Sequence, residues 1–337
     1  MTIRVGIIGT GIMGTDHART LHRFVPGCTV AMLSDVDVER AKALAGELGG
    51  ANVTAEAHAL IQSSDVDAVL IASNDTTHAE YVLSCLEARK PVLCEKPLAP
   101  TSAECHDIIA AQAAVVGDGN ALVSVGFMRR FDPGYVELKE LLQSGVLGAP
   151  LMVHSTGRGV SAPSGSSELT VTGSAIHDID ITPWLLDSEI VEVSWQAPRC
   201  SPEVTDRQDP QFILMRSADG VLISVEIFVN ARYGYDTRCE VVGSLSSASI
   251  SEPHRIIHDQ SLSHGYAYGA DWRPRFADSY RLQSTAWIAS LSTGRPSPLA
   301  TAEDGLQAAL VAEAVIASMY GGGAWVQVPG ASALGTR

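Results

Sequence analysis

Basic residues are scarce in this sequence of 337 residues. Lys and Arg number 23 against 38 for Asp and Glu, which gives a formal net charge of −15 at pH 7. An acidic surface repels the phosphates of nucleic acids and the head groups of anionic membranes, and no basic stripe or zinc-finger spacing offsets it. We therefore expect neither a nucleic acid nor a membrane as a partner.

Cysteine and long apolar runs are also scarce. The six cysteines form no C-x-x-C pair and no Cys/His cluster with zinc spacing, so we expect free thiols in a reducing compartment and no bound metal. No apolar run approaches the roughly 20 residues that span a bilayer, and the first strand is not preceded by a signal-like apolar segment. Together these absences predict a cytoplasmic protein.

What the sequence does have is a glycine-rich turn near its beginning. The apolar run 3–8 predicts a strand, Gly9-Thr10-Gly11-Ile12-Met13-Gly14 follows it, and 12–24 has a helical pattern. In a dinucleotide site these glycines permit a tight turn, let the backbone approach the pyrophosphate, and allow close packing of the helix. The helix N-terminus adds free N–H groups for the phosphates. A glycine-rich turn without a ligand is the weaker interpretation.

Asp35 follows the second predicted strand, at 28–34. A carboxylate at this point accepts hydrogen bonds from the adenosine ribose and repels a 2′-phosphate, which favours NAD over NADP. Asp35 is also a plausible turn or N-cap residue before the predicted helix over 38–48. The nearby Arg40 leaves dual use of NAD and NADP open.

Periodicity divides the chain into two expected domains. Residues 1–124 alternate strands with helices, which predicts an α/β domain with a doubly wound parallel sheet. Its expected strands are 3–8, 28–34, 68–72, 91–94 and 121–125, and its expected helices are 12–24, 37–48, 55–62, 77–88 and 101–116. Residues 125–330 contain longer alternating runs, which predict an α+β domain with a mostly antiparallel sheet. We also expect a mobile loop at 161–167 and a frayed tail from Gly330 to Arg337.

Lys96 is a candidate catalytic residue because it follows the expected strand 91–94. Ligands of open α/β sheets bind outside the carboxyl ends of the strands, so Lys96 is aimed at the nicotinamide end of a cofactor. A lysine there stabilises the alkoxide that develops from a substrate hydroxyl. A surface lysine paired with Glu95 explains the spacing equally well.

His177 and Asp180 form a second candidate. They are three residues apart in a predicted helix near 174–187, so they share a face. A histidine and a carboxylate on one face are suited to proton transfer near neutral pH. From the residues alone, a histidine that satisfies buried backbone groups is slightly favoured.

Several motifs together resemble one family. They are the turn at 9–14, Asp35, Glu95-Lys96-Pro97, Gly126 to Asp132, Ser174 to Leu186, Asn230 to Tyr235 and Arg273 to Tyr280. The chain resembles the Gfo/Idh/MocA oxidoreductases, and within them the inositol 2-dehydrogenase type. The resemblance implies a Rossmann domain, an open-faced sheet used in a homo-oligomer (tetramer or dimer), and NAD-dependent oxidation of a ring hydroxyl of a cyclitol or sugar-like polyol.

The resemblance also implies roles for individual residues. Lys96 contacts the substrate hydroxyl, and His177 is the general acid and base. The polyol pocket is lined by Arg129, His154, Asp180 and Tyr235. The cofactor lies along Ser73, Asn74, His78, Glu95 and Lys96, beyond the glycine turn and its neighbours Ile12 and Met13.

One position departs from the family pattern. The family has an Asp four residues before the catalytic histidine, and this chain has Gly173 there. Glycine can neither orient an imidazole nor share its proton, and Asp180 is the candidate substitute. Pro183 in the same predicted helix removes a helical hydrogen bond. The departure leaves three hypotheses open: a weakened or re-tuned dehydrogenase, an NAD-binding paralogue without turnover, and a redox-neutral NAD enzyme.

Overall fold

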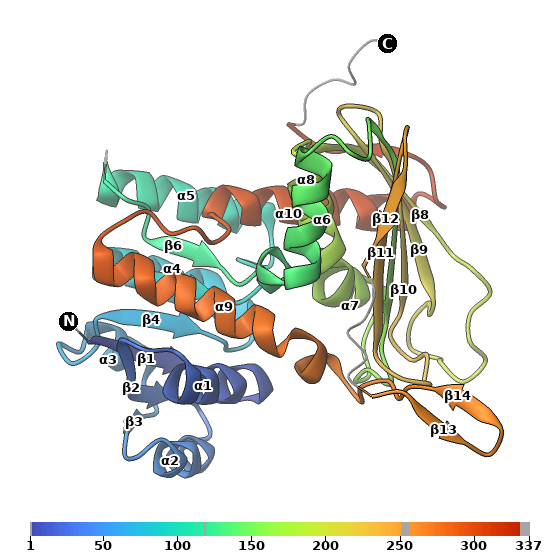
Figure 1. The fold of residues 1–337 in the computed structure, drawn as a ribbon. Coiled ribbons are helices and arrows are strands. Elements are labelled where there is room, and N and C mark those ends of the chain that lie inside the picture. Colours follow the sequence, from blue (N-terminus) through green and yellow to red (C-terminus); the bar gives the residue numbers. More distant parts are fainter. Residues whose placement is uncertain (1, 118, 251–255, 331–337) are drawn as a thin grey trace. The chain divides into compact units, whose positions relative to one another are not determined.

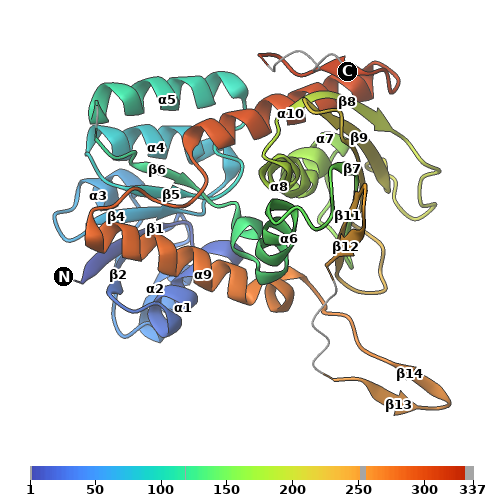
Figure 2. The ribbon, with the colours of Figure 1, turned by 45° about the horizontal axis from the view of Figure 1, so that its top comes forward.

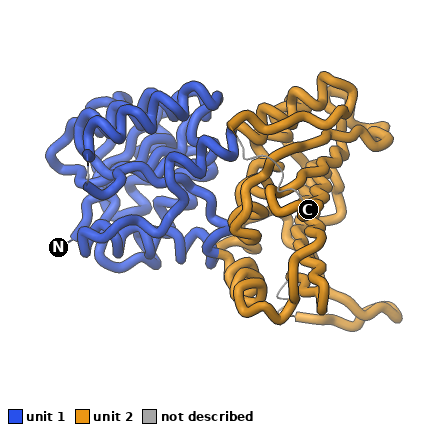
Figure 3. Tube along the Cα trace, turned by 90° about the horizontal axis from the view of Figure 1, so that it is seen from above, with its two compact units in different colours: residues 1–131, 278–309 blue, residues 132–277, 310–337 orange. Residues whose placement is uncertain are grey.

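The computed structural model describes residues 2–117, 119–250 and 256–330. The chain forms two compact units, of which unit 1 comprises residues 1–131 and 278–309 and unit 2 comprises residues 132–277 and 310–337 (Figure 3). Periodicity predicts a single boundary after residue 124 instead. The difference arises because Trp287 and Ile288 of the late helix α9 (Trp272–Thr293) belong to the hydrophobic core of unit 1.

Unit 1 contains a six-stranded sheet in the order β3-β2-β1-β4-β5-β6, in which all neighbouring strands are parallel. Its strands are β1 (Ile3–Ile8), β2 (Cys28–Ser34), β3 (Asn52–Thr54), β4 (Ala68–Ile71), β5 (Val92–Cys94) and β6 (Val123–Val125). The doubly wound sheet is therefore confirmed. Sequence periodicity misses β3 because none of its three residues is buried. The strand order reverses between β1 and β4, which is where such sheets bind ligands.

The helices of unit 1 cover both faces of this sheet (Figure 1). They are α1 (Ile12–Phe24), α2 (Val38–Glu47), α3 (Ala57–Gln62), η1 (Asp75–Thr77), α4 (His78–Glu87), α5 (Ser102–Val116) and η2 (Met128–Phe131). Apolar residues of α1, α2 and α9 share one core with β1 and β2. Local signals fix where helices begin: Asp37 accepts the N–H of Arg40 at the start of α2, and Thr101 and Glu104 form a capping box on α5.

Unit 2 contains a seven-stranded sheet in the order β12-β11-β7-β10-β9-β8-β15. Its strands are β7 (Pro150–Arg158), β8 (Ile190–Gln196), β9 (Gln211–Ser217), β10 (Leu222–Phe228), β11 (Asp236–Gly243), β12 (Ser247–Ser249) and β15 (Val326–Gln327). Strands β7 and β10 run parallel and the other neighbours run antiparallel, so the mostly antiparallel sheet is confirmed. Side chains of β9 and β10 are alternately buried and half-exposed. One face of the sheet is therefore packed and the other is open.

The remaining elements of unit 2 are mainly helical. They are α6 (Pro133–Gln143), α7 (Ser167–Thr170), the π-helical turn η3 (Val171–Ala175) and α8 (Ile176–Leu186), and α10 (Ala302–Tyr320) ends in this unit. A separate hairpin of β13 (His258–Gln260) and β14 (Ser263–Gly265) projects from it (Figure 2).

The loop at 161–167 is bonded to its surroundings. Ser164 Oγ and the Gly165 N–H both donate to Asp206 Oδ2, at 2.7 and 2.8 Å, and the Gln208 N–H donates to Ser167 Oγ at 2.9 Å. Sequence composition does not reveal these bonds because their partners lie about 40 residues away. The tail from Gly330 to Arg337 is expected to fray. Apart from Gly330 itself, it lies outside the described residues.

Two features are absent from the described residues. None of their helices combines the length and the apolar character that crossing a bilayer requires. They also contain no cluster of three or more His, Cys, Asp or Glu arranged to hold a metal ion.

Candidate active site

The glycine turn between β1 and α1 has little room for side chains on two of its residues. Gly9 has a φ of +89°, and a Cβ there would lie 2.5 Å from the carbonyl oxygen of Ala72. A Cβ on Gly14 would lie 1.8 Å from the carbonyl oxygen of Gly9. By contrast, no described atom lies within 4 Å of a Cβ built on Gly11. Gly9 and Gly14 therefore serve chain packing, and Gly11 leaves its outer side open to a ligand.

Helix α1 begins immediately after this turn, at Ile12. Its N-cap is Gly11, and within the described chain no side chain caps its first N–H groups. An uncapped helix N-terminus offers N–H donors and a positive dipole end to an anion. The first-turn residues Ile12, Met13 and Gly14 thus stand where a pyrophosphate would bind.

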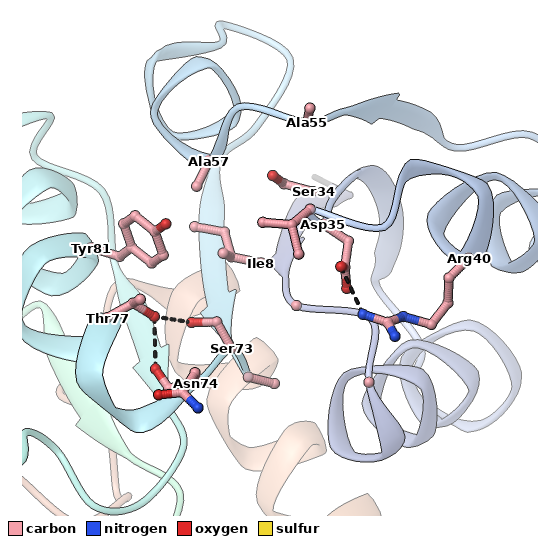
Figure 4. Close-up of a pocket in the computed structure, with 14 residues that line it drawn as sticks. Ile8, Ser34, Asp35, Arg40, Ala55, Ala57, Ser73, Asn74, Thr77 and Tyr81 are labelled. Carbon is pink, nitrogen blue, oxygen red and sulfur yellow. Dashed lines mark hydrogen bonds and ion pairs between the residues drawn. The ribbon is translucent and has the colours of Figure 1, made fainter.

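A cavity of about 410 Å³ lies beside the turn (Figure 4). Its lining includes Gly9, Gly11, Asp35, Ser73 and Asn74, so the structure brings these five predicted cofactor residues together. The volume falls within the range of small-molecule and cofactor sites. These residues therefore fit the adenosine half of a dinucleotide.

Asp35 is the charged centre of this cavity. Its Oδ2 accepts hydrogen bonds from the N–H and the hydroxyl of Thr10, at 2.6 and 2.7 Å, and its Oδ1 accepts the Asp37 N–H at 2.8 Å. Arg40 Nη2 donates to the same Oδ1 at 2.7 Å. Burial alone would raise the pKa of Asp35, but the hydrogen bond from Arg40 and those from Asp37 and Thr10 lower it to about 2. The carboxylate is therefore ionised at neutral pH.

The predicted cofactor residues after β4 have different surroundings. Ser73 Oγ lies 2.7 Å from Thr77 Oγ1, and Asn74 Oδ1 accepts the Thr76 N–H at 3.1 Å, which fixes the start of η1. His78 is buried behind them, with its Nδ1 2.7 Å from the carbonyl oxygen of Pro97. His78 is not among the cavity-lining residues, and it joins the ends of β4 and β5.

Sequence reasoning missed the apolar part of the cavity. Val36, Ala55, Ala57 and Tyr81 line it together with Ile8. In Figure 4 the ring of Tyr81 lies beside the side chains of Ile8 and Ala57. Such groups suit the flat face of an aromatic ligand such as adenine. In the sequence, the only indication of this apolar lining is Val36, an apolar residue directly after Asp35. The structure shows that its side chain is almost fully exposed.

Glu95 and Lys96 follow β5 in unit 1. Glu95 is buried, its Oε1 lies 2.7 Å from His17 Nε2, and its Oε2 accepts the Lys96 N–H at 3.2 Å. The Glu95 carboxylate therefore faces the interior, whereas Lys96 is only half-buried. Arg129, on η2 of the same unit, is buried.

His177 lies in unit 2 on the first turn of α8, directly after the π-helical turn η3. Such π-helical turns occur frequently at functional sites. His177 is half-buried, whereas Asp178 and Asp180 are buried. Asp178 points to the sheet, since its Oδ2 is 3.9 Å from a Cβ built on Gly157 of β7.

Gly173 lies inside η3. No described atom lies within 4 Å of a Cβ built on it. A larger side chain therefore has room at this position, so packing does not require glycine. Pro183 lies within α8, which continues past it to Leu186.

The structure does not bring His154 together with His177. On β7, Val153, Ser155 and Gly157 face α8, so His154 points to the open face of the sheet. Its Nδ1 lies 2.9 Å from Ser224 Oγ on β10. Tyr235, which precedes β11, is half-buried and packs edge-on against Phe276, with ring centroids 6.3 Å apart.

Comparison with known proteins covers most of the chain. The model of an oxidoreductase family with an NAD-binding Rossmann fold matches residues 3–126, and that of the GFO/IDH/MocA C-terminal domain matches residues 135–249. The chain belongs to the GFO/IDH/MocA oxidoreductase family. It is thus an NAD-dependent oxidoreductase.

Similar GFO/IDH/MocA proteins extend over nearly the whole length. The chain is 50% identical to inositol 2-dehydrogenase 2 of Paenarthrobacter aurescens over 97% of this chain and 99% of the relative. It is 32% identical to myo-inositol dehydrogenase from Lactobacillus casei, solved with NAD(H) and myo-inositol, with a TM-score of 0.93 over 100% and 99% of the two chains. The scyllo-inositol dehydrogenase of the same species, solved with NAD(H) and scyllo-inositol, is 25% identical, with a TM-score of 0.89 over 97% and 99%.

Proposed function

We propose that this chain oxidises a ring hydroxyl of a cyclitol such as myo-inositol, or of a similar polyol, to a ketone. The observation that carries the proposal is its 50% identity to an inositol 2-dehydrogenase over nearly the full length of both chains. The glycine turn, Asp35 and the adjoining cavity support the proposal, because they fit NAD. When bound, NAD supplies the acceptor for the hydride that leaves the carbinol carbon.

In this proposal the protein moves the proton of the reacting hydroxyl. His177 takes that proton as the general base and passes it to water, while the Lys96 ammonium stabilises the developing alkoxide. Loss of a hydride and a proton from the carbinol leaves the ketone, so the reaction balances. Arg129, Asp180 and Tyr235 would bind the other hydroxyls. We assign no part in this pocket to His154, whose side chain lies on the open face of the sheet.

A second candidate is an NAD-binding paralogue that does not turn over a polyol. It is favoured by Gly173, because this glycine stands where the family pattern has an aspartate. A redox-neutral enzyme, in which a transient ketone permits elimination or epimerisation, is a third. The proposed dehydrogenase releases NADH in proportion to the polyol consumed. A redox-neutral enzyme would consume polyol without net NADH, and a non-catalytic paralogue would bind NAD and consume nothing.

The test is to incubate the purified protein with NAD and a panel of inositols and sugars, and to follow NADH absorbance. Polyol-dependent NADH with at least one cyclitol is expected. No NADH from any polyol at high enzyme concentration would refute the dehydrogenase. Chromatography of the same mixtures then separates the other two candidates, because only the redox-neutral enzyme alters the polyol.

We also propose that the chain forms a cytoplasmic homo-oligomer through the open face of the unit 2 sheet. That face carries the apolar side chains of Met152, Phe212, Leu214, Leu222 and Phe228. They share the face with Arg158, Glu226 and Arg216, and such a mixture of apolar and polar side chains is typical of a protein–protein interface. Light scattering coupled to size exclusion distinguishes the expected tetramer or dimer from a monomer, which would refute the proposal.

A further inference from the structure

The carboxylate of Asp35 already accepts as many hydrogen bonds as it can hold. An ionised carboxylate has about four lone-pair sites. Thr10 supplies two donors to Oδ2, and Asp37 and Arg40 supply one each to Oδ1. A ribose hydroxyl can therefore donate to Asp35 only by displacing one of these donors.

Arg40 is the donor most easily displaced. The N–H bonds from Thr10 and Asp37 are fixed by the backbone, and the Thr10 hydroxyl is on a short, fully buried side chain. Arg40, in contrast, reaches Asp35 with a long, flexible side chain. That side chain is 48% exposed and lines the cavity, while the side chain of Asp35 is only 4% exposed. Figure 4 shows the guanidinium beside the Asp35 carboxylate. The cation thus competes with the ribose for one oxygen.

The ion pair between Asp35 and Arg40 also reduces the repulsion between this site and a 2′-phosphate. An unpaired aspartate at this point repels the phosphate, and a nearby arginine accommodates it. Here the aspartate is neutralised by a guanidinium 2.7 Å away. A guanidinium has five N–H donors, so Arg40 can keep its bond to Asp35 and still donate to a phosphate.

We propose that Arg40 determines cofactor selectivity in this chain, by competing with the ribose for Asp35 and by binding the 2′-phosphate, so that the site accepts NADP(H) as well as NAD(H). Arg40 also lies 3.7 Å from Asp37 and within 3.4 Å of Thr10 Oγ1. A merely structural role in this turn would affect the two cofactors equally. The ratio of their affinities separates the two roles.

The test measures the binding of NADH and NADPH to the purified full chain by the fluorescence of the reduced nicotinamide, without any polyol. Its result is therefore independent of whether the chain oxidises a cyclitol. We expect Arg40→Gln to weaken NADPH binding about tenfold or more, because a charge-assisted hydrogen bond is lost, while NADH binds as tightly as before or more tightly. Arg40→Lys should retain part of the NADPH affinity, since it keeps the charge without the planar fork.

Lys42→Gln is the matched control. It removes the same charge from the same helix, but Lys42 pairs with Glu39 at 2.8 Å and does not line the cavity. Its ratio of NADPH to NADH affinity should stay at the wild-type value. Thermal unfolding of each variant checks that the fold is intact. The proposal is overturned if Arg40→Gln leaves the ratio of NADPH to NADH affinity unchanged, which includes weakening the binding of both cofactors equally. It is also overturned if Arg40→Gln shifts this ratio no more than Lys42→Gln does.

Discussion

His17 Nε2 and Glu95 Oε1 lie 2.7 Å apart, and both side chains are almost fully buried. Since an ionised carboxylate only accepts hydrogen bonds, His17 must carry its proton on Nε2. The second oxygen of Glu95 accepts the N–H of Lys96. The pair therefore connects α1, directly after the glycine turn, to the backbone of the lysine that we propose acts on the substrate.

Replacing Glu95 by Gln should destabilise the protein in a pH-dependent way. Burial alone would raise the pKa of Glu95, but the hydrogen bond and the charge of His17 outweigh burial, so the pKa is lowered. A lowered pKa stabilises the fold above the unfolded value of about 4.3, and this contribution is lost as pH falls through the folded pKa. We expect Glu95→Gln to lower the free energy of unfolding by about 1.5–3 kcal/mol at pH 7, measured by urea denaturation.

The difference between Glu95→Gln and the wild type should shrink as the pH is lowered below about 4.3. Glu47→Gln is the control, because Glu47 forms an exposed ion pair with Arg19, a kind worth roughly 0–1 kcal/mol. A loss of stability that is equal at every pH would contradict the assignment.

Lys96→Met should abolish most of the turnover and leave the cofactor bound. A positioned acid–base or alkoxide-stabilising group contributes about 10²–10⁴-fold to rate, so kcat should fall by that factor. The cavity beside the glycine turn is unchanged in the variant, so NADH fluorescence should still report binding. A kcat within threefold of the wild type would remove Lys96 from the proposed chemistry.

Much of unit 1 is predictable because its signals are local. Strands β1 and β2 have the predicted bounds, since an apolar run ends at Gly9 in one case and at Asp35 in the other. Strand β3 has no apolar run and is not predictable in this way. The cavity residues Gly9 and Asp35 follow from their positions at the carboxyl ends of strands, whereas only the family resemblance indicates Asn74.

The other features depend on contacts that the chain makes at long range. The pair of His17 and Glu95 joins residues 78 positions apart, and neither the helix nor the strand pattern indicates it. The direction of His154 depends on which face of β7 packs against α8, and strand alternation leaves that choice open. Residues 278–309 return to unit 1 because Trp287 completes its core.

Three cysteines should resist alkylation in the native protein, namely the buried Cys85 and Cys94 and the half-buried Cys28. Burial raises the pKa of Cys85 to about 12, that of Cys28 to about 11, and that of Cys94 well above its usual value. Only the thiolate reacts, so iodoacetamide at pH 8 should leave these three unlabelled, while unfolding in urea exposes all of them. Mass spectrometry of the native protein checks this, and rapid labelling of Cys85 would contradict it.

Restoring an acid at position 173 should increase turnover. In the proposed mechanism His177 works without the aspartate that the family pattern places four residues earlier. No described atom lies within 4 Å of a Cβ built on Gly173, so Gly173→Asp can be accommodated. A carboxylate there orients the imidazole and stabilises its protonated form, and we expect kcat with the best cyclitol to rise about tenfold or more.

Two matched variants separate charge from backbone effects. Gly173→Asn keeps the shape and a hydrogen-bonding oxygen without the charge, so it should raise kcat less than Gly173→Asp. Gly173→Ala adds only a Cβ, and it should stabilise the helical segment by roughly 0.5–1 kcal/mol through backbone entropy. If Gly173→Asp instead lowers kcat, the glycine belongs to a working site tuned to another substrate. If Gly173→Asp and Gly173→Ala raise kcat equally, helix stability rather than a proton partner limits His177.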